Sequence, residues 1–261
     1  MADSRSGAAM VVPGLPVPVA VFSGGGTGGH LYPALALSEA LSSLRPDLRV
    51  FFVGALQGVE ARILPERGLD HLLVPVRGFR RGKILGNLSV LWALLRSLVA
   101  TGQLLSRLRP GVVVVTGGYA GGPAGLMAGV MGIPLALQEQ NARPGFTTRV
   151  LSLWSRQVHL AFPESRDLLP RRARSRACMS GNPVRAVTRV DEVGARSHFR
   201  LDPDARVVLA VGGSQGAKGI NQAVLDMIGS VNLGDRAWPE DAVLLWATGP
   251  KNFHEVDVAL E

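Results

Sequence analysis

The chain has a single cysteine, few aromatic residues and no long uninterrupted apolar run, and each shortage excludes a class of protein. Cys178 is alone among 261 residues, so an internal disulfide is excluded and a reducing compartment is indicated. Aromatic residues make up only 5%, which gives little support to a base-stacking surface, and we expect no nucleic-acid partner. The most apolar stretch, residues 84–108, contains Arg96, Gln103 and Arg107, so we do not expect it to span a membrane.

The hydrophobic content and the positive net charge predict a globular protein with an anionic partner. Hydrophobic residues make up 47%, enough for one large or two modest domains with hydrophobic cores. The 28 Lys and Arg exceed the 20 Asp and Glu, and the net charge of +8 suits a phosphorylated substrate or acidic lipid headgroups. Residues 1–16 resemble a signal peptide only superficially, because Pro13, Gly14 and Pro16 break the apolar part, and we expect a disordered tail.

The most informative segment is a glycine-rich loop between an apolar strand at 17–22 and a helix that begins near Leu31. Its sequence is Gly24-Gly25-Gly26-Thr27-Gly28-Gly29-His30. Glycines allow another molecule to approach the main chain, and the helix N-terminus offers N–H groups and partial positive charge. Such a loop holds an anion, most often a phosphate. His30 places a proton acceptor beside that anion.

The sequence of this loop also fits two other interpretations. Gly24, Gly26 and Gly29 fit the G-x-G-x-x-G pattern of dinucleotide sites, but the next strand, 49–53, ends in Gly54-Ala55-Leu56-Gln57 and has no acid at its tip. We therefore expect no NAD or FAD, no other cofactor and no metal. Taken alone, the loop could also be a glycine turn that only permits tight packing of strand on helix.

The apolar pattern predicts an α/β fold in which strands and helices alternate with short connections. This order implies a parallel sheet covered by helices on both faces. We take 157–161 as the last strand of the first domain. The expected strands are 17–22, 49–53, 71–76, 112–116, 134–137 and 157–161, and the expected helices are 31–44, 59–67, 84–108 and 124–131.

A second glycine-rich loop begins at Gly117-Gly118-Tyr119, directly after the strand at 112–116. The carboxyl ends of parallel strands meet at one edge of a sheet, so one large phosphorylated ligand could touch both loops. The strand at 134–137 is followed on the same edge by the polar cluster Gln138-Glu139-Gln140-Asn141, in which Glu139 is a candidate for a catalytic or sugar-binding role. A helix-capping or surface role for Glu139 is equally open.

Two further segments set the organisation of the chain. The helix at 84–108 has an unusually wide apolar face led by Trp92 and preceded by Arg80, Arg81 and Lys83, so it is either core or a surface for anionic membranes.

Residues 181–185 indicate a domain boundary. Beyond it the pattern restarts with a strand at 206–211, a third glycine loop and a strand at 243–247. This loop is no P-loop, because Lys218 has no glycine directly before it and no Ser or Thr directly after it.

Five blocks of the sequence, in this order, resemble the MurG family. The resemblance covers about residues 17–250 and implies a GT-B fold, in which two Rossmann-like domains face a cleft. We expect a tail at 1–16, an acceptor and membrane domain at 17–182, and a partial UDP-GlcNAc-binding domain at 183–261. The blocks are Gly25-Gly26-Thr27-Gly28-Gly29-His30, Gly117-Gly118-Tyr119 through Pro123, Glu139-Gln140-Asn141, Gly181-Asn182-Pro183-Val184-Arg185 and Gly212-Gly213-Ser214-Gln215-Gly216-Ala217.

The resemblance also implies an activity. Members transfer GlcNAc from UDP-GlcNAc to the MurNAc C4 hydroxyl of undecaprenyl-diphosphate-MurNAc-pentapeptide, with inversion, in peptidoglycan synthesis. They work peripherally on the cytoplasmic face of the anionic cell membrane, where other proteins of cell-wall synthesis are further partners. His30 matches a candidate base, ahead of Glu139. The positions matching UDP-GlcNAc contacts are Thr27, Gly28, Gly29, Asn141, Arg185 and Ser214, and those matching the loops for the acceptor diphosphate are Gly25, Gly26, Gly117, Gly118 and Tyr119.

Two departures from the family pattern keep alternatives open. Gln138 stands where the family usually has histidine, so an acid–base role at that position is lost. Residues 206–261 predict only two strands, and we expect the second domain to be incomplete and to bind the donor weakly. One alternative is therefore a catalytically incompetent module that binds only acceptor and membrane. Another is a different GT-B nucleotide-sugar enzyme, such as a 2-epimerase.

Overall fold

The chain folds into two units, residues 1–186 and 187–261, and each is described by itself. The computed structural model describes residues 17–78, 86–185, 191–213, 215–235 and 237–260. The expected tail at 1–16, the cations at 80–83 and Ser214 lie outside these ranges. The division falls a few residues after the boundary expected at 182/183.

The first unit is built on a parallel sheet of seven strands in the order β3-β2-β1-β4-β5-β6-β7. Its strand β1, which lies between β2 and β4, is buried along its whole length, as expected for an apolar strand with helices on both faces. The strands are β1 (Val19–Ser23), β2 (Arg49–Ala55), β3 (His71–Val74), β4 (Val112–Val115), β5 (Leu135–Glu139), β6 (Gln157–Leu160) and β7 (Ala177–Met179).

The interpretation of 157–161 as the last strand of this domain is wrong, because β7 pairs in parallel beyond it. Val158 lies opposite Ala177 and Leu160 opposite Met179. The sequence signal is weak since β7 has only three residues and no β-branched side chain.

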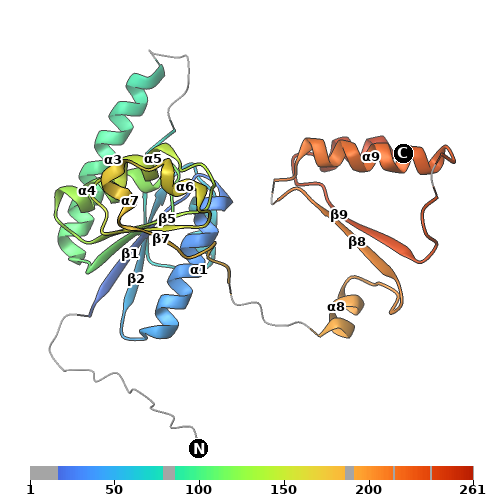
Figure 1. Cartoon of the computed structure of the whole chain (residues 1–261), viewed down its shortest axis with the longest axis horizontal. Helices are drawn as coiled ribbons and strands as arrows, with labels where there is room; N and C mark the ends of the chain where they lie inside the picture. The colour runs from blue at the N-terminus through green and yellow to red at the C-terminus, as the bar shows by residue number, and fades with distance from the viewer. Residues whose placement is uncertain (1–16, 79–85, 186–190, 214, 236, 261) are drawn as a thin grey trace, which may run out of the picture. The chain divides into compact units, whose positions relative to one another are not determined.

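Helices cover both faces of this sheet (Figure 1). α1 (Gly28–Leu44) and α2 (Glu60–Glu66) pack on the side of Phe22 and Phe52. The opposite core contains Val21 and receives α3 (Gly86–Leu108), α4 (Gly121–Val130) and α5 (Phe146–Leu151), with the short α6 (Glu164–Asp167) and α7 (Arg171–Arg174) at its end. Neighbouring residues of β1 thus enter opposite cores, as the period of a strand requires.

Helix α3 combines a buried and an exposed apolar part. Leu105 is completely buried, and the helix packs against α4 and β3. The N-terminal half projects beyond the sheet (Figure 1), and Trp92 there is 65% exposed. By length and composition Ser89–Leu108 could cross a membrane, with a mean hydropathy of 1.2, but 28% of the segment is buried inside this unit. Its inner face therefore forms core, and its outer face is an exposed apolar surface.

The second unit contains a parallel pair of strands, β8 (Arg206–Val211) and β9 (Ala242–Ala247). The helices are α8 (Glu192–His198), α9 (Lys218–Asn232) and α10 (Phe253–Leu260). The prediction of two strands is confirmed over the described part of this unit. Val224 of α9 and Val256 of α10 are buried, whereas Leu209 of β8 is 65% exposed.

Candidate functional site

The two glycine-rich loops of the first unit meet where the order of the sheet reverses. The chain runs outward from β1 to β3 and then returns to place β4 on the other side of β1. The loops after β1 and β4 therefore leave neighbouring strands at the same edge. This reversal point is where open α/β sheets bind their ligands.

Direct contacts join the two loops. The Thr116 hydroxyl donates to the main-chain oxygen of His30 at 2.7 Å. Gly26 and Gly118 have φ values of +84° and +73°, which favour glycine. A Cβ on Gly118 would overlap the Gly25 carbonyl, and one on Gly26 would overlap the Tyr119 ring. These glycines are thus required by the close approach of one loop to the other.

The N-terminus of α1 has no side-chain cap. Thr27 occupies the N-cap position with extended backbone, and its side chain makes no capping hydrogen bond. The first N–H groups of a helix have no acceptor within the helix, so those of Gly28 and Gly29 are suited to an anion. A Cβ on Gly29 would meet only the Thr27 hydroxyl, at 3.8 Å. The fold does not need glycine there, which points to a ligand as the reason for it.

Glu60, the first residue of α2, is completely buried beneath the first loop. Its carboxylate accepts from the Gly26 N–H at 2.9 Å and from the Ala55 N–H at 2.8 Å. Cβ atoms on Gly25, Gly54 or Gly58 would overlap it. Among the described residues Glu60 has no salt bridge, so these N–H groups balance its charge. The Gly26 N–H is therefore committed to Glu60, and anion contacts shift to Gly28 and Gly29.

Tyr119 lies over the same loop, and the Glu60 carboxylate affects the pKa of its phenol. Burial raises the pKa of the Tyr119 phenol, and the negative charge of Glu60 raises it further. The phenol therefore stays neutral beside the glycine loops across the physiological pH range.

The ring of His30 is held in a defined orientation. Its Nδ1 lies 3.1 Å from the Thr116 carbonyl oxygen. A carbonyl can only accept, so Nδ1 carries the proton in the neutral ring and the lone pair lies on Nε2. Gly117 makes room for this ring, since a Cβ there would lie 3.0 Å from Nδ1. His30 is half-buried at the edge of the site.

Glu139 organises the loop after β5. It is buried, and its carboxylate accepts from the main-chain and side-chain nitrogens of Asn141, at 3.1 and 2.8 Å, and from the Gly145 N–H at 3.0 Å. Glu139 thus fixes the loop and holds the Asn141 amide. This geometry favours the capping role over proton transfer.

Arg185 lies away from the glycine loops. Its guanidinium donates to Glu39 of α1 at 2.5 Å, and Arg67 lies 3.5 Å from the same carboxylate. The remaining predicted contact, Ser214, is outside the described residues. The structure therefore brings together the predicted residues of the first three glycine and polar blocks, but not Arg185.

Sequence reasoning assigned no role to Glu60, Thr116 or Gln140. The available signal for Glu60 was an acidic residue that follows Gly54 and Gly58 and stands at the start of an apolar helix. Gln140 belongs to the Glu139-Gln140-Asn141 block but had no role of its own there, and Thr116 gave no signal. The importance of both comes from contacts with His30 across the sheet. Among the described residues, no group of three or more His, Cys, Asp and Glu could hold a metal ion.

An apolar cleft of about 580 Å³ begins at Tyr119. Arg77 is the only described charged residue among those that line it, and α3, α4 and α5 form its walls. Its lining extends from Tyr119 and Gly122 at the second glycine loop to Val90 and Leu94 of α3. The other lining residues are Val76, Val90, Leu94, Gly122, Leu126, Phe146, Thr147, Val150 and Leu151.

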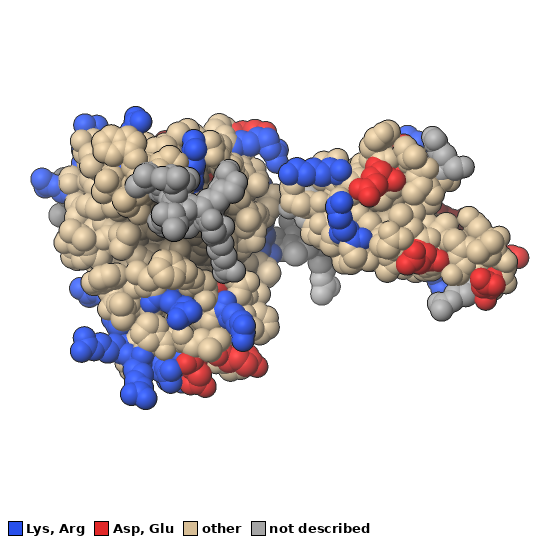
Figure 2. Space-filling view, turned by 90° about the horizontal axis from the view of Figure 1, so that it is seen from above, with Lys and Arg blue, Asp and Glu red and all other residues tan. Residues whose placement is uncertain are grey.

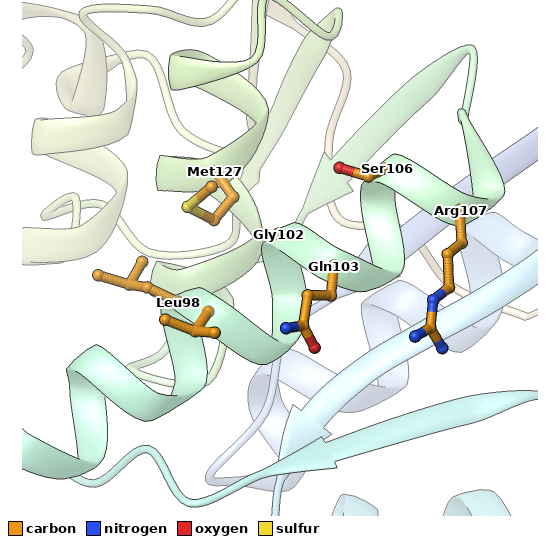
Figure 3. Close-up of a pocket in the computed structure, with 7 residues that line it drawn as sticks. Leu98, Gly102, Gln103, Ser106, Arg107 and Met127 are labelled. Atoms are coloured by element: carbon orange, nitrogen blue, oxygen red, sulfur yellow. The ribbon is translucent and has the colours of Figure 1, made fainter.

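A separate groove lies between α3 and α4 (Figure 3). The Met127 side chain of α4 lies against Gly102 of α3, where a Cβ would be 2.9 Å from its Cε, while Gln103 and Arg107 extend from α3 (Figure 3). None of the predicted site residues lines this groove. Basic side chains outnumber acidic ones on the face of the first unit seen in Figure 2.

Comparison with known proteins identifies the first unit. Residues 20–160 match the glycosyltransferase family 28 N-terminal domain. The UDP-N-acetylglucosamine--N-acetylmuramyl-(pentapeptide) pyrophosphoryl-undecaprenol N-acetylglucosamine transferase of Moorella thermoacetica is 40% identical over 234 residues, which are 89% of this chain and 61% of the relative. The chain spans about three-fifths of the length of such relatives.

Solved structures agree in fold. MurG of Acinetobacter baumannii aligns over 94% of this chain and 64% of its own, with a TM-score of 0.63 and 26% identity. A UDP-N-acetylglucosamine 2-epimerase from Listeria monocytogenes aligns over 94% and 67% with a TM-score of 0.61, but at 13% identity it shows the fold alone. The expected GT-B fold is confirmed. The chain belongs to glycosyltransferase family 28, and its predicted resemblance to MurG is confirmed.

Proposed function

We propose that this chain carries the acceptor side and the catalytic base of a transferase that moves GlcNAc from UDP-GlcNAc to the MurNAc C4 hydroxyl of undecaprenyl-diphosphate-MurNAc-pentapeptide. One observation carries the proposal: the uncapped N-terminus of α1 lies beside a histidine whose Nε2 lone pair is available. An anion site next to a base is what transfer from a nucleoside diphosphate requires.

The proposed step moves one proton and exchanges one bond. His30 Nε2 takes the proton of the C4 hydroxyl as its oxygen attacks the anomeric carbon of GlcNAc from the face opposite UDP. The bond from that carbon to the phosphate oxygen breaks, its electron pair leaves with UDP, and the configuration inverts. Thr27, Gly28, Gly29 and Asn141 would contact the donor, with Arg185 and Ser214 as further contacts. The loops at Gly25–Gly26 and Gly117–Tyr119 would hold the acceptor diphosphate, through groups other than the Gly26 N–H that Glu60 occupies.

The lipid part of the acceptor has a matching surface. The cleft from Tyr119 to α3 is mainly apolar, with Arg77 at its lining. Leu91, Trp92, Leu95 and Val99 extend this apolar surface to the outside of α3. We infer that this side rests on an anionic membrane at its cytoplasmic face, with the prenyl chain leaving the site through the cleft.

Ligand binding and transfer test the proposal. We expect a short-chain lipid I analogue and UDP-GlcNAc each to bind in calorimetry. Gly29→Val should lose at least tenfold in UDP-GlcNAc affinity, because a branched side chain blocks the helix N-terminus that we assign to the donor. Gly229→Val, the same change at a glycine of α9 where a Cβ would meet nothing within 4 Å, is the matched control. Retained binding by Gly29→Val would contradict the phosphate site.

His30→Ala tests the base. With radiolabelled UDP-GlcNAc and the same analogue, kcat should fall by roughly 10²-fold with little change in analogue affinity. Equal turnover in the two proteins would contradict the base assignment. Analogue binding without any turnover by the unsubstituted chain would support the module that only binds acceptor and membrane.

Vesicle sedimentation tests the membrane surface. Binding should need anionic lipid and weaken as salt rises, since the screening length is about 8 Å at physiological ionic strength. Trp92→Ala should reduce it, whereas Trp154→Ala, at a 52% exposed position outside that patch, should not. Equal binding to neutral vesicles in high salt would contradict the electrostatic part.

A further inference from the structure

We propose that Gln140 is a positioning residue for His30, which holds the imidazole with its proton on Nδ1 and its lone pair on Nε2. The catalytic meaning of this inference rests on the proposed function, but the contact itself does not. Gln140 follows directly after β5, and His30 lies in the first turn of α1. The sheet order, not the sequence, brings them together across β4.

The geometry gives the Nδ1 proton two acceptors. The Thr116 carbonyl oxygen lies at 3.1 Å and Gln140 Oε1 at 3.4 Å from the same nitrogen. Both are oxygens that accept, so together they favour the tautomer with Nδ1 protonated. Of these two acceptors only Gln140 is a side chain, so it is the one that substitution can remove.

The surroundings of the Gln140 Nε2 atom indicate that the main interaction of this side chain is its contact with His30. Its Nε2 is buried and has no hydrogen-bond partner among the described residues. Burying an unpaired amide N–H is unfavourable, so a glutamine serving only to brace the loop would be expected to use both amide atoms. Here the hydrogen bond to His30 is the amide's one defined interaction.

Neighbouring side chains in the same segment behave differently. The Gln138 amide donates to the Gly181 carbonyl at 3.0 Å, and the Asn141 amide donates to Glu139 at 2.8 Å. These contacts connect strands and loops and are explained by the fold. Gln140 instead contacts the residue with the most direct chemical role.

The amide orientation and the tautomer fix each other. Rotating the amide by 180° would point its NH₂ group at the protonated Nδ1, and two donors would then face each other. With Oε1 toward the ring, Nδ1–H is held and Nε2 remains the basic nitrogen. When Nε2 takes a proton, both acceptors still bind Nδ1–H, so the ring need not turn during the reaction.

Nitrogen NMR of the histidine rings in the full chain tests this inference. Ring ¹⁵N shifts and couplings report which nitrogen carries the proton, and the missing signal of His30→Gln assigns the residue among five histidines. In the unsubstituted chain we expect mainly Nδ1–H. Gln140→Met should raise the fraction with Nε2–H by about fivefold, the effect of one ordinary hydrogen bond. Gln140→Glu keeps an acceptor and should retain Nδ1–H.

The control is Gln103→Met, the same change at an exposed position of α3, which should leave the His30 signals unchanged. An unchanged tautomer ratio in Gln140→Met would overturn the inference, and so would a matching shift in Gln140→Glu and Gln140→Met. If His30→Ala left transfer intact, the proposed function would fail while these spectra still decided the contact. In transfer assays Gln140→Met should lower kcat by about tenfold with unchanged acceptor affinity.

Discussion

Each unit begins its sheet with the same order of elements, a strand followed by a glycine-rich loop and a helix. The two strands nevertheless differ greatly in how far they are buried. β1 of the first unit is buried at all five positions, whereas β8 of the second is exposed at five of six. Both strands are apolar and both are followed by a glycine-rich loop and a helix. β1 lies between two paired strands, while β8 pairs with β9 only within its two-stranded sheet.

This difference teaches that an apolar strand sequence is not enough to form a core. A parallel strand is stable when strands flank it and helices cover both faces, which requires several βα units. The first unit meets this condition with seven strands and two separate cores. Within the described residues, the second unit has two strands and a few buried side chains such as Val224 and Val256.

The largest expected effect is the loss of stability when a large apolar side chain is truncated to alanine in each unit. Phe22→Ala should destabilise the first unit by about 3–5 kcal/mol, because the ring is 1% exposed and packs against Phe52. Leu209→Ala should change the second unit by about 0.5 kcal/mol or less. Hydrogen exchange read by mass spectrometry along a urea series would report each unit separately, and similar losses would contradict the contrast.

Glu60→Gln should destabilise the first unit by about 1–3 kcal/mol. The buried carboxylate accepts from the N–H groups of Gly26 and Ala55, and the variant replaces one accepting oxygen by a donor. Glu66→Gln, on the same helix in an exposed pair with Arg62, is the control and should have little effect. Thermal unfolding measures both. Equal transition temperatures for the two variants would show that Glu60 does not hold the loop.

Tyr119 offers a smaller and more specific signal. Its pKa is raised first by burial and then by the charge of Glu60, so Glu60→Gln should lower it while leaving it above 10. Because the folded pKa exceeds the unfolded one, its neutral form contributes stability below about pH 10 that is lost as pH rises through the folded value. Absorbance at 295 nm follows this titration, and Tyr119→Phe separates it from Tyr32, the only other tyrosine. An unchanged Tyr119 pKa in Glu60→Gln would show that the charge of Glu60 does not raise it.

The smallest expected effect concerns the ion pair of Arg185 with Glu39. Both side chains are partly exposed, at 39% and 51%, so Arg185→Ala should change the stability of the first unit by about 1 kcal/mol or less. Calorimetry with UDP-GlcNAc then shows whether Arg185 has a second role. A change in donor affinity without a change in stability would favour the binding role implied by the family motif.

Most of the fold could be predicted from local patterns. The valine-rich strand at 112–115 and the glycine loop after it are visible because residue spacing and glycine content act locally. Strand β7 could not be found, since three residues carry little pattern and pairing with β6 creates the strand. The site was predicted in part: His30 and the loops came from the sequence, while the commitment of Glu139 to its own loop required coordinates.

The sequence by itself determined the alternation of strands and helices, the glycine loops and the family. These follow from the order of residue types along the chain. Tertiary structure alone decided that the Glu60 carboxylate accepts from the Gly26 N–H, that Thr116 and Gln140 orient His30, and that Arg185 pairs with Glu39. The physical reason is distance along the chain: these partners are separated by 34 to 146 residues, and only the reversal of strand order and the packing of α1 and α2 bring them within hydrogen-bonding range.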